Sequence, residues 1–449
     1  MGGQFTSLKI VLPAAIAFSW PLLLSAGDET SAGRNAFSQP LTTLDAEGLD
    51  RFRAGNLLFR KLWVAAPSDF PASDGLGPLF NARSCQSCHV RDGRGRLPED
   101  TADGVAGLVL HLSLGGQPEP SYGRQLQTMA TSGLSPEGHI SVTYHETAVP
   151  VRDGPPVLLR HPQYRIDTPV FGPLAPEAVL SPRLAPQLIG LGLLADIPAP
   201  SILANTDPED RDGDGISGRA NFVSGAEGEV ELGRFGLKAS ITDLRDQTAL
   251  AFLLDLGLST DPHPEAWGDC TEAELACRTA PDGEARDGTD RREVDSESLD
   301  LLTFYTASLA VPPRRDPASP LVMRGATIFA EAGCGSCHVP EFRFPSATLG
   351  TTISIKPYTD LLLHDMGEGL ADGATEGLAA GQEWRTPPLW GIGLTGAVSG
   401  QVHFLHDGRA RTLLEAILWH GGEAEAARNR VTALPPPDRA ALIAFLESL

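Results

Sequence analysis

The chain has 449 residues, of which 41% are apolar, and this is enough for two domains of ordinary size or one large domain with insertions. Its 35 Lys and Arg residues stand against 57 Asp and Glu residues, for a formal charge of -22. This charge argues against nucleic acid or an anionic membrane surface as a partner, and it favours a basic protein or a neutral small molecule.

The first segment of the chain has the pattern of a secretory signal. Lys9 precedes an apolar run that ends near residue 24, and small residues follow around Ala26. The pattern predicts a signal peptide over residues 1–26, with an uncleaved anchor as the alternative. No later stretch approaches the ~20 continuous apolar residues of a spanning helix. We therefore expect a soluble periplasmic protein without a membrane span after cleavage.

Helical periodicity appears in residues 44–63, 181–198, 242–257 and 296–310. Residues 105–170 instead alternate short apolar runs with Gly and Pro, which predicts loops and a few short strands. Pro312 and Pro313 should end the helix that begins at Ser296 or Ser298. After them, a helix runs from about residue 319 towards residue 334, and amphipathic helices close the chain.

These patterns predict a mainly α fold with long loop-rich insertions and a few short strands. We expect an N-terminal domain over residues 27–165 and a middle region over residues 166–315. A C-terminal domain should then cover residues 316–449. Each of the two end domains contains one copy of a repeated cysteine motif.

The repeated motif is CxxCH, in "ARSCQSCHVRDG" (82–93) and "EAGCGSCHVPEF" (331–342). In such a motif two thiols bond the vinyl groups of a haem, and the adjoining imidazole ligates the iron. A thioredoxin-like thiol pair needs no His there, and structural zinc needs a fourth nearby ligand. The sequence therefore predicts two covalently bound haem c groups, held by Cys85, Cys88 and His89, and by Cys334, Cys337 and His338.

The two remaining cysteines, Cys270 and Cys277, lie seven positions apart in "DCTEAELACRTAP". An exported protein meets an oxidising compartment, and this spacing can close a small loop. The sequence predicts a disulfide between them.

Six ordered segments carry a resemblance to a known family. They are "FNARSCQSCHVRDGRG", "DRDGDGISGRANF", "LGRFGLKAS", "LLLHDMGEGLADG", "EWRTPPLWGIGL" and "HFLHDGRARTLLEAILWHGG". The chain resembles the bacterial di-haem oxidoreductase family of peroxidase-like proteins and, more distantly, the di-haem cytochrome c peroxidases. The resemblance implies two helical, cytochrome c-like haem domains whose haems face each other across an interface. It also implies an N-terminal haem for chemistry and a C-terminal haem for electron transfer.

The resemblance also suggests the second axial ligand of the C-terminal haem. In the peroxidases this ligand stands five residues after a Glu, which places it at His420, five residues after Glu415. The peroxidases usually have Met there, and imidazole should make this haem a poorer store of electrons. Met366 is the competing ligand, and His420 can instead be a helix-capping residue.

For the N-terminal haem the resemblance points to Glu146 as the distal acid/base group, with an exposed strand residue as the alternative. Its sixth ligand stays open. The candidates, each with a surface or hydrogen-bonded position as the alternative, are His111, Met129, His139, His145 and His161.

Two arginines, Arg385 and Arg409, are predicted to pair with haem propionates, since guanidinium binds carboxylates bidentately, and a surface role is the alternative for either. Trp390 and Trp419 are candidate electron relays, although most tryptophans are core residues.

The segment "DRDGDGISGRAN" places Asp210, Asp212 and Asp214 at alternate positions before a Gly turn, as calcium loops do. Asn221 stands where a bidentate Glu completes an EF-hand. Structural calcium is therefore one interpretation, and a turn held by Asx hydrogen bonds is the other.

Together these features predict a periplasmic di-haem oxidoreductase that acts on hydrogen peroxide or another small oxidant. The expected partner is a small redox protein that donates or accepts electrons and docks partly through the acidic surface. The alternatives are a di-haem electron carrier without catalysis and an oxidase acting on a protein or polymer.

Overall fold

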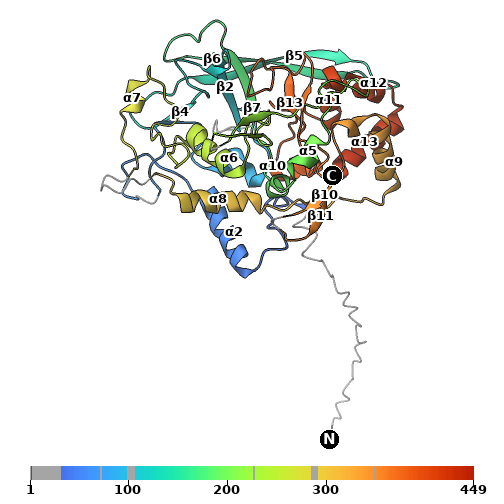
Figure 1. Ribbon diagram of the computed structural model, residues 1–449, viewed down its shortest axis with the longest axis horizontal. Helices are drawn as coiled ribbons and strands as arrows, with labels where there is room; N and C mark the ends of the chain where they lie inside the picture. Colours follow the sequence, from blue (N-terminus) through green and yellow to red (C-terminus); the bar gives the residue numbers. More distant parts are fainter. Residues whose placement is uncertain are drawn as a thin grey trace.

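The structure is a computed structural model that describes residues 2, 32–70, 73–98, 107–225, 228–284, 292–346 and 349–449. The predicted signal peptide, apart from Gly2, lies outside the described residues. Figure 1 shows a body of helices and short strands.

The prediction of a mainly α fold is wrong, because the structure is 29% helical and 19% strand. Much of the strand content lies in the segment where the sequence predicted mostly loops. There β2 (Leu108–Leu114) pairs with β3 (Gln117–Pro118), and β5 (His139–Val149) pairs with β6 (Val157–Asp167) along eleven residues each. Strand β2 also pairs with β7 (Val179–Leu184), which lies beyond that segment and overlaps the predicted helix over residues 181–198. Pairing between segments as distant as β2 and β7 leaves little local signal, so the pattern predicted too few strands.

Helices from distant parts of the chain build the core beside the first CxxCH. They are α2 (Ala46–Phe59), α6 (Leu244–Ala251) with the π-helical turn η3 (Phe252–Leu256), and α8 (Ser296–Ala307). Asp45 caps α2 through a hydrogen bond from the Gly48 amide of 2.8 Å, and Asp295 caps α8 in the same way. At Gly55 a Cβ would lie 2.5 Å from the Cβ of Tyr305, so glycine permits the close contact between α2 and α8.

A second helical core surrounds the other CxxCH. It contains α9 (Pro320–Glu331), α11 (Leu413–Leu418), α12 (Glu425–Thr432) and α13 (Pro436–Ser448). Helices α9 and α13 lie against each other, and a Cβ at Gly325 would be 2.0 Å from the Ala441 carbonyl oxygen. Pro320 and Pro436 occupy the first turns of these two helices, where a missing amide hydrogen costs nothing.

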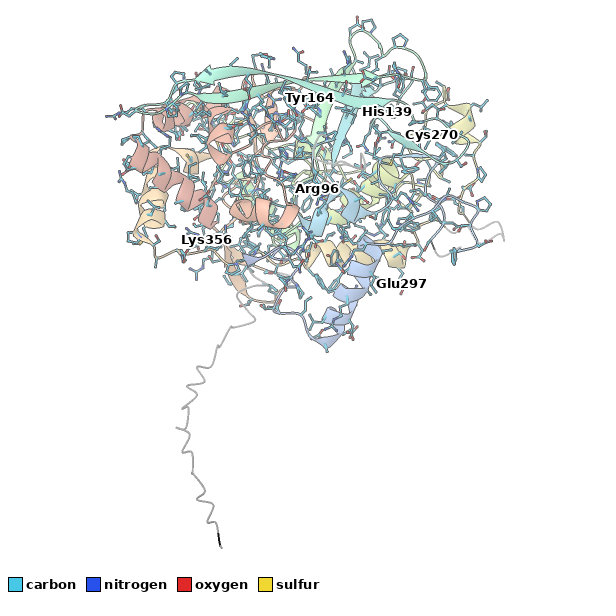
Figure 2. All side chains as sticks on the ribbon, turned by 180° about the vertical axis from the view of Figure 1, so that it is seen from behind. Arg96, His139, Tyr164, Cys270, Glu297 and Lys356 are labelled. Atoms are coloured by element: carbon cyan, nitrogen blue, oxygen red, sulfur yellow. A yellow bond between two sulfur atoms is a disulfide. The ribbon has the colours of Figure 1, made fainter. Side chains whose placement is uncertain are left out.

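The β5–β6 hairpin crosses from the N-terminal half of the chain onto the C-terminal core (Figure 1). Leu159 of β6 and Val151, in the loop between β5 and β6, are buried there with Trp419. Tyr164 donates to the Asp407 carboxylate at 3.1 Å, and the hairpin lies along one edge of the molecule in Figure 2. The domain boundaries at residues 165 and 315 stay a prediction.

The other elements are short. They are β1 (Leu79–Phe80), α3 (Cys85–Cys88), η1 (Val90–Asp92), β4 (Met129–Ala130), α4 (Leu191–Ala195), α5 (Ala199–Leu203), β8 (Phe222–Ser224), β9 (Val230–Leu232), α7 (Leu275–Arg278), η4 (Cys334–Ser336), β10 (Phe342–Pro345), β11 (Thr352–Ile355), β12 (Leu363–Asp365), β13 (Glu383–Arg385), η5 (Ile392–Leu394), α10 (Thr395–Ser399) and η6 (Gly422–Ala424).

The predicted disulfide is confirmed, since Cys270 and Cys277 are bonded with their Cα atoms 6.3 Å apart. Figure 2 shows Cys270 at the end of the molecule away from the C-terminal helices. Within the described ranges, every helix is too short or too polar to cross a bilayer.

Candidate haem sites

Both CxxCH motifs open into one continuous cavity of about 990 Å³. Single small-ligand pockets usually measure ~300–1,000 Å³, so this cavity is at the upper end of that range. The walls come from the helices of both cores and from β2, β7 and η3. The fold therefore brings the two motifs, which are more than two hundred residues apart in the chain, to one internal space.

The two motif histidines are held in the same way. His89 Nδ1 donates to the Pro186 carbonyl oxygen at 2.7 Å, and His338 Nδ1 donates to the Tyr358 carbonyl oxygen at 2.9 Å. A hydrogen bond of this kind fixes the tautomer and leaves Nε2 as a lone-pair donor to a metal. Burial lowers the pKa of each imidazole to about 4, so both are in the neutral form that binds iron.

The four motif cysteines are free thiols. Burial raises the pKa of Cys85 to about 12 and that of Cys334 to about 11, and it also raises the pKa values of Cys88 and Cys337. A redox-active thiol pair needs the opposite shift. In the described part of the chain, neither pair belongs to a group of three or more His, Cys, Asp or Glu side chains that are close enough together to hold a zinc ion. The thiols fit attachment to a haem edge better than either rival.

His420 is held by a backbone carbonyl in the same way as the two motif histidines. Its Nδ1 donates to the Ala416 carbonyl oxygen at 2.8 Å, and its ring lines the cavity. Burial lowers its pKa, and it is close enough to His338 to lower the pKa of that imidazole as well. Met366 also lines the cavity. The pair His338 and His420 can therefore hold one iron from two sides, with Met366 as the competing ligand.

His364, which lies beside Met366, is engaged through both ring nitrogens. Nε2 bonds to Asp360 at 2.8 Å and Nδ1 bonds to Glu423 at 2.7 Å. Burial opposes its charged form, but these hydrogen bonds and the Cys337 thiol together raise its pKa to about 12. His364 is thus a structural cation that ties β12 to the segment after His420.

Of the two predicted arginines, the structure places Arg385 at the cavity and Arg409 away from it. Arg385 lines the cavity, and burial lowers its pKa to about 10. Arg409 instead bonds Asp407 at 2.8 Å and the Gly369 carbonyl oxygen at 2.6 Å, and it is absent from the cavity wall.

The sequence prediction missed Arg94, which stands five positions after His89. Arg94 lines the cavity, burial lowers its pKa to about 10, and its Nε has no hydrogen-bond partner among the described residues. A buried guanidinium with an open donor is costly unless an anion meets it. Its place in the basic run directly after the motif was the available signal.

Glu146, the predicted acid/base group, lies on β5 outside the cavity wall. Its carboxylate pairs with Arg411 at 2.8 Å, and both side chains are 37% exposed. Of the five side chains considered as sixth ligands, His111 lines the cavity and the other four do not. Sequence reasoning also missed Asp255, whose position on the cavity wall depends on the π-helical turn η3.

The residues present fit two haems. Among the described residues, the cavity is lined by three imidazoles that donate from Nδ1 to backbone carbonyls, by two pairs of free thiols, and by the buried guanidiniums of Arg94 and Arg385. His406 Nε2, which also belongs to a cavity-lining residue, has no hydrogen-bond partner among the described residues. Such open polar groups are what a bound cofactor satisfies.

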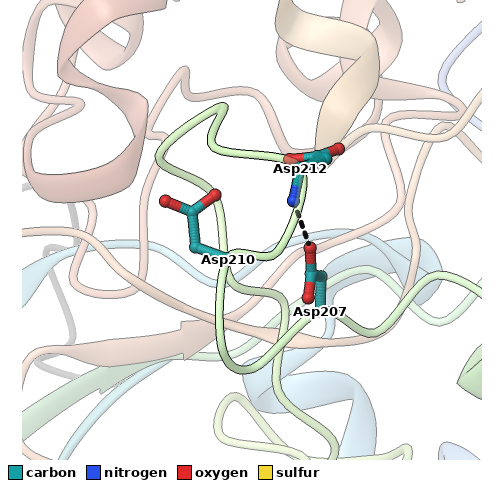
Figure 3. Close-up of side chains that lie close together, drawn as sticks. All are labelled: Asp207, Asp210 and Asp212. Atoms are coloured by element: carbon teal, nitrogen blue, oxygen red, sulfur yellow. Dashed lines mark hydrogen bonds between the residues drawn. The ribbon is translucent and has the colours of Figure 1, made fainter.

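The aspartate-rich loop brings Asp207, Asp210 and Asp212 together (Figure 3). Asp207 was not predicted, whereas the predicted Asp214 is not in this group. Asp207 accepts the Arg211 amide at 2.8 Å, and Asp212 accepts the Asp214 amide at 3.1 Å. These Asx hydrogen bonds explain the loop, and calcium binding there stays a prediction.

Two ligand sets around one cavity define a di-haem protein. The chain belongs to the family described as "Di-haem oxidoreductase, putative peroxidase", which matches residues 25–107 and 135–449. The resemblance seen in the sequence is thereby confirmed, and the chain is an oxidoreductase.

No curated protein matches the chain. Among solved structures, it is similar to a chain of hydrazine synthase from Kuenenia stuttgartiensis, determined under 20 bar of xenon. The identity is 15%, the match covers 99% of this chain and 100% of that chain, and the TM-score is 0.32. A score this low carries no argument about fold or activity.

Proposed function

We propose that this chain is an exported di-haem c-type enzyme that reduces hydrogen peroxide or a related small oxidant. Its N-terminal haem is the catalytic one, and its C-terminal haem transfers electrons. The observation that carries this proposal is that the two motifs differ in the number of cavity-lining histidines that are fixed through Nδ1 and leave Nε2 open. Among the described residues that line the cavity, His338 and His420 at the C-terminal motif both donate from Nδ1 to a backbone carbonyl and leave Nε2 open, whereas at the N-terminal motif His89 is the one imidazole held in this way.

The different number of available histidines at the two motifs implies two kinds of iron site. An iron with imidazoles on both faces is closed and suits electron transfer, whereas an iron with one imidazole keeps a position for a small molecule. A haem held at the open site would supply the iron at which peroxide is reduced. Cys85, Cys88 and His89 hold the open site, and Cys334, Cys337, His338 and His420 hold the closed one.

Side chains of the chain also affect the charge balance and the potential of the two haem sites. Arg94 and Arg385 are buried at the cavity and offer guanidinium donors to haem propionates. Replacing the usual Met by His420 lowers the potential of the C-terminal haem and stabilises its oxidised state. Such a haem passes electrons onward readily and stores them poorly.

Export and the partner follow from other features. The disulfide between Cys270 and Cys277 suits the oxidising periplasm, in agreement with the predicted signal peptide. The formal charge of -22 favours a basic redox protein as electron donor, because opposite charges speed encounter. Two one-electron deliveries by this partner complete one peroxide turnover.

The test combines electron paramagnetic resonance of the purified ferric protein with a peroxide assay. We expect one high-spin and one low-spin haem, and peroxide consumption with a reduced small cytochrome as donor. Two low-spin haems without peroxide consumption would show an electron carrier instead. A pyridine haemochrome assay should count two covalent haems per chain, and fewer would contradict the assignment of the motifs.

A further inference from the structure

Three polar side chains form a connected row on the cavity wall: His111 on β2, Gln125 on the segment beside it, and Asp255 on η3. The row shares its end of the cavity with Cys85, because Asp255 acts electrostatically on that thiol. Peroxide reduction needs a group that moves protons there. Glu146 lies elsewhere, so the row is the place to look for this group.

The backbone places His111 and Gln125 side by side. They form an antiparallel bridge, flanked by hydrogen bonds from the Leu112 amide to the Arg124 carbonyl at 2.7 Å and from the Leu126 amide to the Leu110 carbonyl at 2.9 Å. Residues directly opposite in such a bridge carry their side chains on one face. The Gln125 side chain is accordingly a hydrogen-bond partner of the His111 imidazole.

The other hydrogen bonds of Gln125 determine which residue is the donor in its hydrogen bond with His111. Its Nε2 donates to Asp255 Oδ1 at 2.8 Å and to the Leu254 carbonyl oxygen at 3.0 Å, which uses both amide hydrogens. The amide oxygen therefore accepts from an N–H of His111. The other ring nitrogen of a neutral His111 then carries a lone pair.

Fixed charges stand beside the imidazole. Arg183 and Glu376 form an ion pair, both line the same cavity, and Ser240 donates to Glu376 at 2.7 Å. Burial, followed by the charge of Arg183, lowers the pKa of His111 to about 3. The imidazole is therefore neutral, and the Arg183–Glu376 ion pair lies near it.

We propose that His111 is the proton-transferring residue of the N-terminal haem site, and that Gln125 and Asp255 are positioning residues that fix its tautomer. The inference rests on the proposed peroxide reduction. His111 takes the proton from one oxygen of hydrogen peroxide and returns it to the other oxygen while the O–O bond breaks. Overall, peroxide, two electrons from the redox partner and two solvent protons yield two waters, and His111 ends unchanged.

Hydrogen cyanide provides a test that needs no turnover. Like peroxide, it must lose a proton to bind ferric iron, so a base beside the iron speeds its association. In His111→Gln we expect the association rate constant to fall by about 10²–10⁴-fold, the usual contribution of general acid–base catalysis. The spin states of both ferric haems should stay as in the wild type. His139→Gln, an exposed histidine of β5, is the matched control and should bind cyanide at the wild-type rate.

Gln125→Met is the second variant. It removes the acceptor that orients His111, while Gln127 still donates to the Leu254 carbonyl at 2.9 Å. We expect the cyanide association rate constant to fall by less than in His111→Gln, again without a change of spin state. A merely structural role of Gln125 would not lower this rate constant while both spin states stay the same. If His111→Gln fails to retain haem, the cyanide rate of Gln125→Met tests the role of His111 instead.

A wild-type cyanide rate in these variants would overturn the inference. So would conversion of a low-spin haem to high spin in His111→Gln, because His111 would then be an iron ligand. If the wild-type protein itself takes up neither cyanide nor peroxide, the proposed function fails. If it takes up both and the variants do the same, only the role of His111 fails.

Discussion

The indole of Trp384 stacks on the imidazole of His406, with ring centroids 3.9 Å apart and planes inclined by 11°. Both rings line the cavity, and Trp384 donates from Nε1 to the Leu370 carbonyl oxygen at 2.9 Å. Lys238 Nζ lies 4.2 Å from the centroid of the indole. The stack thus joins the cavity wall to a buried cation.

Trp384→Ala should lower the free energy of unfolding by about 3–5 kcal/mol, the usual cost of emptying the site of a large buried aromatic ring. Trp384→Phe keeps a ring against His406 and should lose less than half as much. Urea denaturation of the haem-loaded protein measures both values. A loss below 1 kcal/mol in the alanine variant would contradict a structural role for the stack.

His420→Ala should change the C-terminal haem from low spin to high spin, because it removes the ligand that we assign opposite His338. Electron paramagnetic resonance of the ferric protein reads this change directly. Met366→Leu is the matched control and should leave the low-spin signal in place. If the two variants exchanged results, Met366 would be the ligand and His420 a helix-end residue.

Arg94→Met should lower the reduction potential of the N-terminal haem. Removing a buried positive charge near the iron stabilises its ferric state. A tenfold change in the equilibrium corresponds to about 59 mV for one electron, and a shift of that order is expected. Spectroelectrochemical titration checks it. Arg409→Met, which leaves the cavity wall intact, should shift the potential far less, and an equal shift would undo the distinction drawn between these arginines.

Two buried carboxyls, Glu137 and Glu274, should make the protein less stable as the pH rises. Each is 1% exposed, burial is the largest cause that raises the pKa of each, and the two acids are hydrogen-bonded to each other. The folded protein therefore binds more protons than the unfolded chain, whose glutamates titrate near about 4.3. The stabilisation is complete below that pH and is lost as the pH rises towards the folded pKa values.

Buried neutral histidines act in the opposite direction, because their lowered pKa values favour the folded state above about 6.5. The comparison of wild type with Glu274→Gln isolates the acids. The variant should lose less stability than the wild type between pH 5 and pH 8, measured as urea midpoints. Parallel curves for the two proteins would show that Glu137 and Glu274 do not share a proton.

Glu146→Gln should leave peroxide consumption within about twofold of the wild type, because the side chain lies on β5 and pairs with Arg411 at a half-exposed position. Exposed ion pairs contribute only about 0–1 kcal/mol, so stability should change little. Steady-state kinetics with the same donor cytochrome measures the effect. A hundredfold loss of peroxide consumption would show that Glu146 is the proton-transferring residue and would contradict the assignment of this role to His111.

The sequence by itself determined the parts whose chemistry is local. Cys85, Cys88 and His89 stand within five consecutive positions, as do their C-terminal counterparts, and Cys270 meets Cys277 across a short loop. Such spacing constrains geometry whatever the rest of the chain does. The family resemblance carried the further step to His420, which the structure brings to the cavity.

Only the tertiary structure decided which other polar groups face the haem sites. Arg94, His111 and Asp255 reach one cavity from a loop, a strand and a π-helical turn, whereas Glu146 and Arg409 are held in ion pairs outside its wall. The pairing of β2 with β7, and the packing of the β5–β6 hairpin on the C-terminal core, set these positions. Contacts between segments so far apart leave no periodic trace in the chain, because their register is chosen by burial in the assembled fold.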